Sequence, residues 1–77
     1  MMNIFTKIKQ EKHFTEGEKV FAEYILNHPH DIVQYDVQYI AKKSYVSVSA
    51  IYRVIEKLGL SGFNQLKVEI SLQLENY

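Results

Sequence analysis

The chain lacks cysteine altogether, has one proline and three glycines among its 77 residues, and contains no long hydrophobic run. Without cysteine, a disulfide framework and a thiolate zinc site are both excluded, which fits a reducing cytoplasm. No apolar stretch approaches the roughly 20 residues of a membrane span, and the N-terminus lacks the long apolar core of a signal peptide. We therefore expect a cytoplasmic protein with no membrane partner.

What is present suits one small globular domain. Apolar residues make up 47% of the chain and charged residues 23%, which is too apolar for a disordered protein. A chain of this length can bury one modest core, so residues 1–77 are expected to form a single domain. No internal repeat and no alternating strand pattern is found. The domain should be all-α, a compact bundle of five to six helices.

Charge is balanced in total but unevenly distributed. The net charge of zero argues against a polyanionic partner. Residues 37–68, however, hold five basic side chains against the single acid Glu56, a net of +4; the five are Lys42, Lys43, Arg53, Lys57 and Lys67. A cationic half is what a one-sided DNA binder needs, although a solvated charge pattern with no partner would look the same.

Capping residues and apolar spacing place the helices along the chain. Glu18 completes a Thr-x-x-Glu capping box, and Gly59 can end a helix in the left-handed conformation. The side chains expected to cap helix N-termini are those of Thr15, Asp36, Ser47 and Ser61. The expected helices cover residues 3–10, 15–28, 30–35, 37–43, 48–58 and 62–75. The second should turn inward a stripe formed by Val20, Phe21, Tyr24 and Ile25.

Residues 37–56 read as two short helices joined by a tight turn. Ala41 is the small residue where the helices cross, and Ile51 is the apolar anchor of the second helix, which should run from Val48 to about Leu58. Such a homeodomain-like helix-turn-helix can place its second helix in a DNA major groove. Similar helix pairs occur in small proteins that bind no nucleic acid, so the pattern alone leaves both possibilities open.

The second helix of this motif has an apolar and a polar face. Its outer face should comprise Ser49, Arg53, Glu56 and Lys57, flanked by Ala50 and Tyr52. We expect Arg53 to read a guanine edge and Lys57 to touch only the DNA backbone, with neither needed for folding. The predicted DNA-binding residues are Lys43, Tyr45, Ser47, Ser49, Ala50, Tyr52, Arg53 and Lys57.

Residues that could support chemistry are few. His28, His30 and Asp31 lie close together, but no further ligand has a recognisable spacing, so no metal site is expected. His13 has no evident acid or nucleophile partner, and no glycine-rich phosphate loop is present. We predict neither an enzyme nor a bound cofactor.

The last expected helix carries more apolar surface than one small core can cover. One stripe comprises Phe63, Leu66, Ile70 and Leu74, and a second comprises Val68 and Leu72. One of these two stripes, together with the apolar face of residues 4–8, predicts a homodimer. The second stripe also supports an alternative function, in which the domain is a helical protein–protein module that does not bind DNA.

Three segments resemble a known family. Residues 14–18 (Phe-Thr-Glu-Gly-Glu) with 24–29 (Tyr-Ile-Leu-Asn-His-Pro), and above all Leu-Gly-Leu-Ser-Gly-Phe-x-x-Leu-Lys at 58–67, are similar to the N-terminal helix-turn-helix domain of RpiR-type bacterial transcriptional regulators. The resemblance covers about residues 14–74. It implies a dimeric repressor or activator of sugar-catabolism genes that binds roughly palindromic double-stranded DNA. It also implies that a phosphosugar effector acts only through a C-terminal sugar-isomerase-like (SIS) domain, which this sequence does not contain.

Three positions depart from the pattern of that family. Tyr45 stands where the family usually has the turn glycine, so either the turn differs or Tyr45 adopts a strained conformation. Val48 replaces a common proline and Ala50 a common threonine. The base preference of that threonine cannot be transferred, so the operator sequence stays open.

Overall fold

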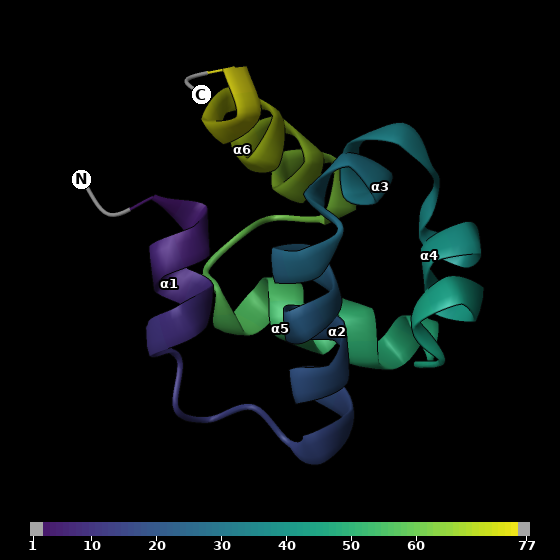
Figure 1. Cartoon of the computed structure of the whole chain (residues 1–77). Coiled ribbons are helices and arrows are strands. Elements are labelled where there is room, and N and C mark those ends of the chain that lie inside the picture. Colours follow the sequence, from purple (N-terminus) through teal and green to yellow (C-terminus); the bar gives the residue numbers. More distant parts are fainter. Residues whose placement is uncertain (1–2, 76–77) are drawn as a thin grey trace.

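The computed structural model describes residues 3–75, which form six α-helices and no strand (Figure 1). This confirms the expected all-α bundle. The helices are α1 (Ile4–Gln10), α2 (Glu16–Asn27), α3 (Pro29–Gln34), α4 (Val37–Ser44), α5 (Val48–Lys57) and α6 (Phe63–Glu75). Within this range no helix is long and apolar enough to cross a membrane.

Side-chain caps define where four of these helices begin, the first at Asn3, whose Oδ1 accepts the Thr6 N–H at 2.9 Å and caps α1. Thr15 Oγ1 accepts the Glu18 N–H at 3.3 Å while Glu18 Oε1 accepts the Thr15 N–H at 3.1 Å, so the predicted capping box is confirmed. Asp36 and Ser47 accept N–H bonds from residues three positions ahead, at 2.8 and 3.0 Å, and so cap α4 and α5 as predicted. Gly59 has a φ of +77°, as expected beyond the end of α5.

The predicted cap at Ser61 is wrong. Helix α6 begins at Phe63, one residue later than expected, which leaves Ser61 too early in the chain to occupy the N-cap position. The bond at this end runs the other way, since the Ser61 N–H donates to Gln65 Oε1 at 2.6 Å.

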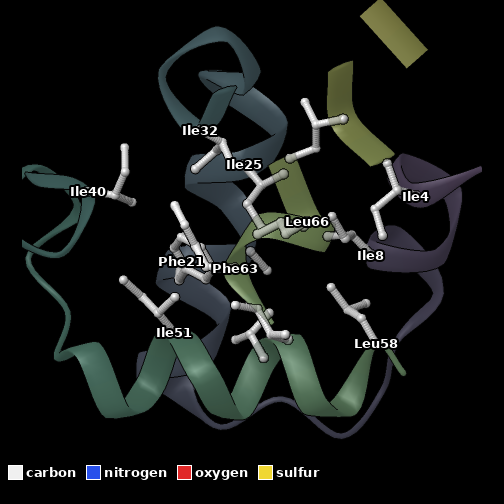
Figure 2. Packing of buried hydrophobic residues seen from close by; sticks show 14 of the residues in the cluster. Ile4, Ile8, Phe21, Ile25, Ile32, Ile40, Ile51, Leu58, Phe63 and Leu66 are labelled. Carbon is white, nitrogen blue, oxygen red and sulfur yellow. The ribbon is translucent and has the colours of Figure 1, made fainter. Parts of the chain in front are cut away.

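A single apolar core lies between α2, α5 and α6, with α1 and α3 packed against α6 (Figure 2). Ile51 of α5 and Leu58, the residue directly after α5, point into the core that also holds Phe21 of α2 and Leu66 of α6, and all four are fully buried. Each isoleucine or leucine removed from water in this way stabilises the fold by roughly 1.5–3 kcal/mol. The core therefore holds α5 against the bundle along one face and leaves its other face outside.

Two expected apolar faces differ from the structure. Val20 was expected inside α2, but it is half exposed, and the buried residues of this helix are Glu18, Phe21, Ala22 and Ile25. These residues follow a spacing of three to four, so the inward stripe begins at the capping glutamate. The apolar face of α1 needs no second subunit, because Ile4 and Ile8 are buried within the chain itself.

Lys67 joins α6 to the end of α3. Its Nζ donates to the carbonyl oxygens of Tyr35 at 2.6 Å and of Val33 at 3.4 Å. The last carbonyls of a helix have no partner within it and carry partial negative charge, so a lysine is well suited to bind them.

Candidate DNA-binding surface

The turn between α4 and α5 contains a strained tyrosine. Tyr45 ends α4 with φ 61° and ψ 36°, the left-handed conformation, and its side chain is 93% exposed. The Val46 N–H then bonds to the Ala41 carbonyl at 3.2 Å, which closes the end of the helix. Of the two possibilities left open by the sequence, the strained conformation is therefore the one present.

We expect Tyr45→Gly to raise the free energy of unfolding by about 0.5–1 kcal/mol. The left-handed conformation costs an L-residue roughly 1–2 kcal/mol, and the greater freedom of glycine in the unfolded chain offsets part of that gain. Urea unfolding measures the difference, and Tyr45→Ala is the control because it removes the ring but keeps Cβ. An equal gain in both variants would show that the ring, and not the backbone, is the source of the strain.

Helix α5 turns one face to the core and one to solvent. Its buried residues are Ala50, Ile51, Val54 and Ile55, and its exposed ones include Ser49, Tyr52, Arg53, Glu56 and Lys57. The placement of Ala50 beside the outer face was wrong. Ala50 is 4% exposed because it lies one helical turn before Val54 and shares its inward direction. It therefore presents no surface to DNA.

A buried carboxylate joins α2 to the outer face of α5. Glu18 has a side chain only 1% exposed, and its Oε2 accepts a bond from Arg53 Nε at 3.0 Å. Its Oε1 accepts bonds from Lys57 Nζ and the Thr15 N–H, and Lys57 also donates to the His13 carbonyl at 2.8 Å. The expectation that Arg53 and Lys57 are both independent of the fold is thus wrong.

These contacts keep Glu18 ionised. The hydrogen bond from Lys57 lowers the pKa of Glu18, with help from the Thr15 N–H and Arg53, and together they outweigh the burial that raises it. The resulting pKa is about 2, against an ordinary value of 4.5.

Arg53 and Lys57, the two cations bonded to Glu18, differ in how much of each side chain remains exposed. The side chain of Arg53 is 55% exposed although its Nε is bonded, whereas that of Lys57 is 33% exposed and its ammonium bonds two acceptors. Arg53 therefore still presents part of its guanidinium to solvent. Lys57 acts mainly as a link between α5, α2 and the loop at His13.

Internal pairing also changes the electrostatic argument. Three of the five cations counted between residues 37 and 68, namely Arg53, Lys57 and Lys67, have partners within the fold. Lys42 and Lys43 remain exposed in the last turn of α4, and Lys43 Nζ lies 6.0 Å from the centre of the Tyr39 ring. The cationic character of this half is thus weaker than the residue count suggests.

The turn and the first half of α5 gather most of the predicted residues. The exposed ones are Lys43, Tyr45, Ser47, Ser49, Tyr52 and Arg53. Sequence reasoning missed a shallow groove of about 500 Å³ beside Tyr52, which the start of α6 lines with Asn64 and Gln65. The sequence signal for this groove was the helix that was expected to begin near Gly62. Elsewhere within residues 3–75, no three His, Asp or Glu side chains gather as a metal site would require.

Comparison with known proteins identifies the fold that carries this surface. A family model described as the helix-turn-helix domain of the rpiR family matches residues 2–77. The chain belongs to this family. The rpiR-family domain also resembles the crystal structure of the N-terminal domain of the transcriptional regulator YbbH from Bacillus subtilis. The TM-score is 0.80 and the identity 34%, covering 87% of this chain and 83% of that one.

Curated relatives of the rpiR-family domain are longer proteins. YbbH of Bacillus subtilis, named as an HTH-type transcriptional regulator, is 35% identical over 65 residues, which are 83% of this chain and 23% of YbbH. An HTH-type transcriptional regulator of Clostridium perfringens is 36% identical over 62 residues, 80% of this chain and 22% of that protein. The chain thus spans about a quarter of the length of these relatives.

Proposed function

We propose that the domain binds double-stranded DNA with α5 in the major groove and so regulates transcription of sugar or phosphosugar genes in the bacterial cytoplasm. One observation carries the proposal: the first half of α5 exposes the polar side chains of Ser49 and Tyr52, directly after a turn that Ser47 caps. A recognition helix contacts bases with its N-terminal residues, so this is the half that must be accessible. The naming of two relatives as transcriptional regulators supports both the role and the expectation that the domain is no enzyme.

The exposed residues divide by the contacts they can make. Arg53 has the planar fork that suits guanine, and Ser49 and Tyr52 can donate to or accept from base edges. Lys43 and Tyr45 lie at the turn, where contact with phosphates is expected. Lys57, proposed from sequence as a backbone contact, is a weaker candidate because its ammonium already has two acceptors.

Selection from a random pool of DNA duplexes tests this function directly. The purified domain should enrich a defined sequence, and its affinity for the enriched duplex should fall as salt rises, because bound phosphates release counterions. If a folded, dimeric sample enriches nothing and binds no duplex at low salt, the proposal fails. That outcome would instead favour a protein–protein module that uses the exposed side of α6.

Arg53→Ala should reduce discrimination by about 1–3 kcal/mol, the contribution of one bidentate arginine–guanine pair. Affinity for the selected duplex should fall by this amount more than affinity for random DNA, as measured by competition binding. Lys43→Ala is the matched control, since loss of one exposed cation should weaken both duplexes alike. Equal weakening of both duplexes by Arg53→Ala would make Arg53 a phosphate contact, and Arg53→Lys would then bind as wild type does.

We also propose that two copies pair through α6 and bind the two halves of a palindromic operator, with their α5 helices roughly 34 Å apart. Val68 and Leu72 are exposed one turn apart on α6, on a stripe that the core of the chain leaves uncovered. The sensing of a phosphosugar is assigned to the SIS-type domain that the family resemblance implies.

Replacing Val68 and Leu72 together by glutamate should raise the dissociation constant of the dimer by at least about tenfold, because charge on this stripe would be desolvated in the interface. Sedimentation equilibrium measures the change. Val20→Glu, the same kind of substitution on the exposed side of α2, should leave it unaltered. A wild-type domain that stays monomeric at millimolar concentration would contradict pairing through α6.

A further inference from the structure

Both oxygens of one buried carboxylate are bonded to the helix that the proposed function places in the groove. Glu18 Oε2 accepts from Arg53 Nε, and Oε1 accepts from Lys57 and from the Thr15 N–H. The two cations lie one helical turn apart on α5 and both reach back to the first turn of α2. Glu18 thus connects the start of α2 to the outer face of α5.

The geometry of the bond to Arg53 matters for what that side chain can do. A guanidinium is planar and rigid, so a bond at Nε fixes the plane in which its two terminal nitrogens lie. These nitrogens form the edge that pairs with a guanine. An unrestrained arginine would lose rotamer entropy on binding, and one already held by a carboxylate loses less of it.

We propose that Glu18 is a positioning residue for DNA recognition, which holds the Arg53 guanidinium in the orientation that reads a base. This inference rests on the proposed function. Glu18 would not touch the DNA itself, and its role would be to make Arg53 selective.

Removing the charge of Glu18 distinguishes this positioning role from a purely structural one. A carboxylate beneath the DNA-facing surface neutralises part of the charge of Arg53 and Lys57, and so weakens the attraction for any phosphate backbone. Removing the charge should therefore help random DNA and harm the preferred site. Loss of structure would instead weaken binding to both.

Glu18→Gln is the test, because glutamine keeps the shape and one acceptor oxygen but not the charge. Competition binding compares the selected duplex with a random duplex of equal length. The ratio of the two affinities should fall at least about fivefold, the lower end of what one arginine–guanine pair supplies, while affinity for the random duplex should be equal or higher. Glu16→Gln is the matched control, since it removes the same charge from the same turn of α2, but Glu16 is almost wholly exposed and its ionic partner is Lys19 of its own helix. Its ratio should match that of the wild type.

A double-mutant cycle shows whether the effect passes through Arg53. In an Arg53→Ala background, Glu18→Gln should cause no further fall in the ratio. A further fall of similar size would overturn the proposal, as would an unchanged ratio in a folded Glu18→Gln variant. Absence of any sequence preference in the wild type would reject the proposed function instead, so the two failures are distinguishable.

A second measurement needs no variant at residue 18. In ¹⁵N-labelled wild-type protein, the Arg53 Nε–H signal should stay slowly exchanging when the selected duplex is added, because its bond to Glu18 persists in the complex. Rapid exchange of that proton in the complex would show that Arg53 leaves Glu18 on binding, and the proposal would fall even if Glu18→Gln does not fold.

Discussion

Acidification from about pH 5 to about pH 2 should remove roughly 2 kcal/mol of folding free energy through Glu18 alone. Its pKa is about 2 in the folded protein against 4.5 ordinarily, so the folded state binds the proton less tightly than the unfolded state does. The stabilisation is complete above the unfolded pKa and is lost as pH falls through the folded one. The shift corresponds to about 3 kcal/mol, which we reduce because only two partly exposed cations cover the carboxylate.

Urea unfolding at a series of pH values measures this effect. Glu18→Gln should be less stable than wild type at neutral pH by about 2 kcal/mol, and the difference should shrink toward zero near pH 2. Glu16→Gln, which removes an exposed carboxylate from the same turn, should follow the wild-type curve. A constant difference between wild type and Glu18→Gln across the whole range would contradict the low pKa.

Ile51→Ala should lower the free energy of unfolding by about 2–5 kcal/mol. Ile51 is fully buried on the inner face of α5, and its truncation loses apolar burial and leaves a cavity beneath Phe21. A domain of this size has a total stability on the order of 5–10 kcal/mol, so the loss is a large fraction of it. Thermal and urea unfolding both report the change.

A smaller truncation at the same position is the control for this substitution. Ile51→Val should cost only about 0.5–1.5 kcal/mol, since it removes one methyl group. At temperatures where Ile51→Ala stays folded, its ratio of selected to random DNA affinity should match the wild type, because the side chain faces the core. A changed affinity ratio in Ile51→Ala would show that the cavity tilts α5. A loss of stability below about 1 kcal/mol in the same variant would show that the core collapses to fill the cavity.

Helix positions were predictable from the sequence because they depend on local chemistry. A capping box at Thr15, an aspartate at 36 and a serine at 47 each act on backbone groups within three residues, and all three are confirmed. The inward orientation of Ala50 could also have been predicted from the sequence, since Ala50 lies four residues before the buried Val54. Reading a small residue as part of the groove surface overlooked that spacing.

The contacts of Glu18 with Arg53 and Lys57 could not be predicted from local chemistry. Arg53 and Lys57 lie 35 and 39 residues further along the chain, and only the packing of α2 on α5 brings them to the carboxylate. The capping box alone explains a glutamate at position 18, so the local pattern did not indicate a second role for Glu18. One signal was available: Glu18 stands at the head of the stripe that continues with Phe21 and Ile25, and a charged residue on a buried stripe needs ionic partners.

The internal pairing of cations affects how long the domain would stay on any one stretch of DNA. With Lys57 and Lys67 bonded within the fold, Lys42, Lys43 and part of Arg53 supply the local attraction, which corresponds to about two phosphates per domain. From 50 to 200 mM salt such a domain would lose only on the order of tenfold in affinity, and its dwell on random sequence would be short. Encounters with wrong sites would end quickly. A long residence would require two linked domains to bind both half-sites together, so that either one can rebind before the other dissociates.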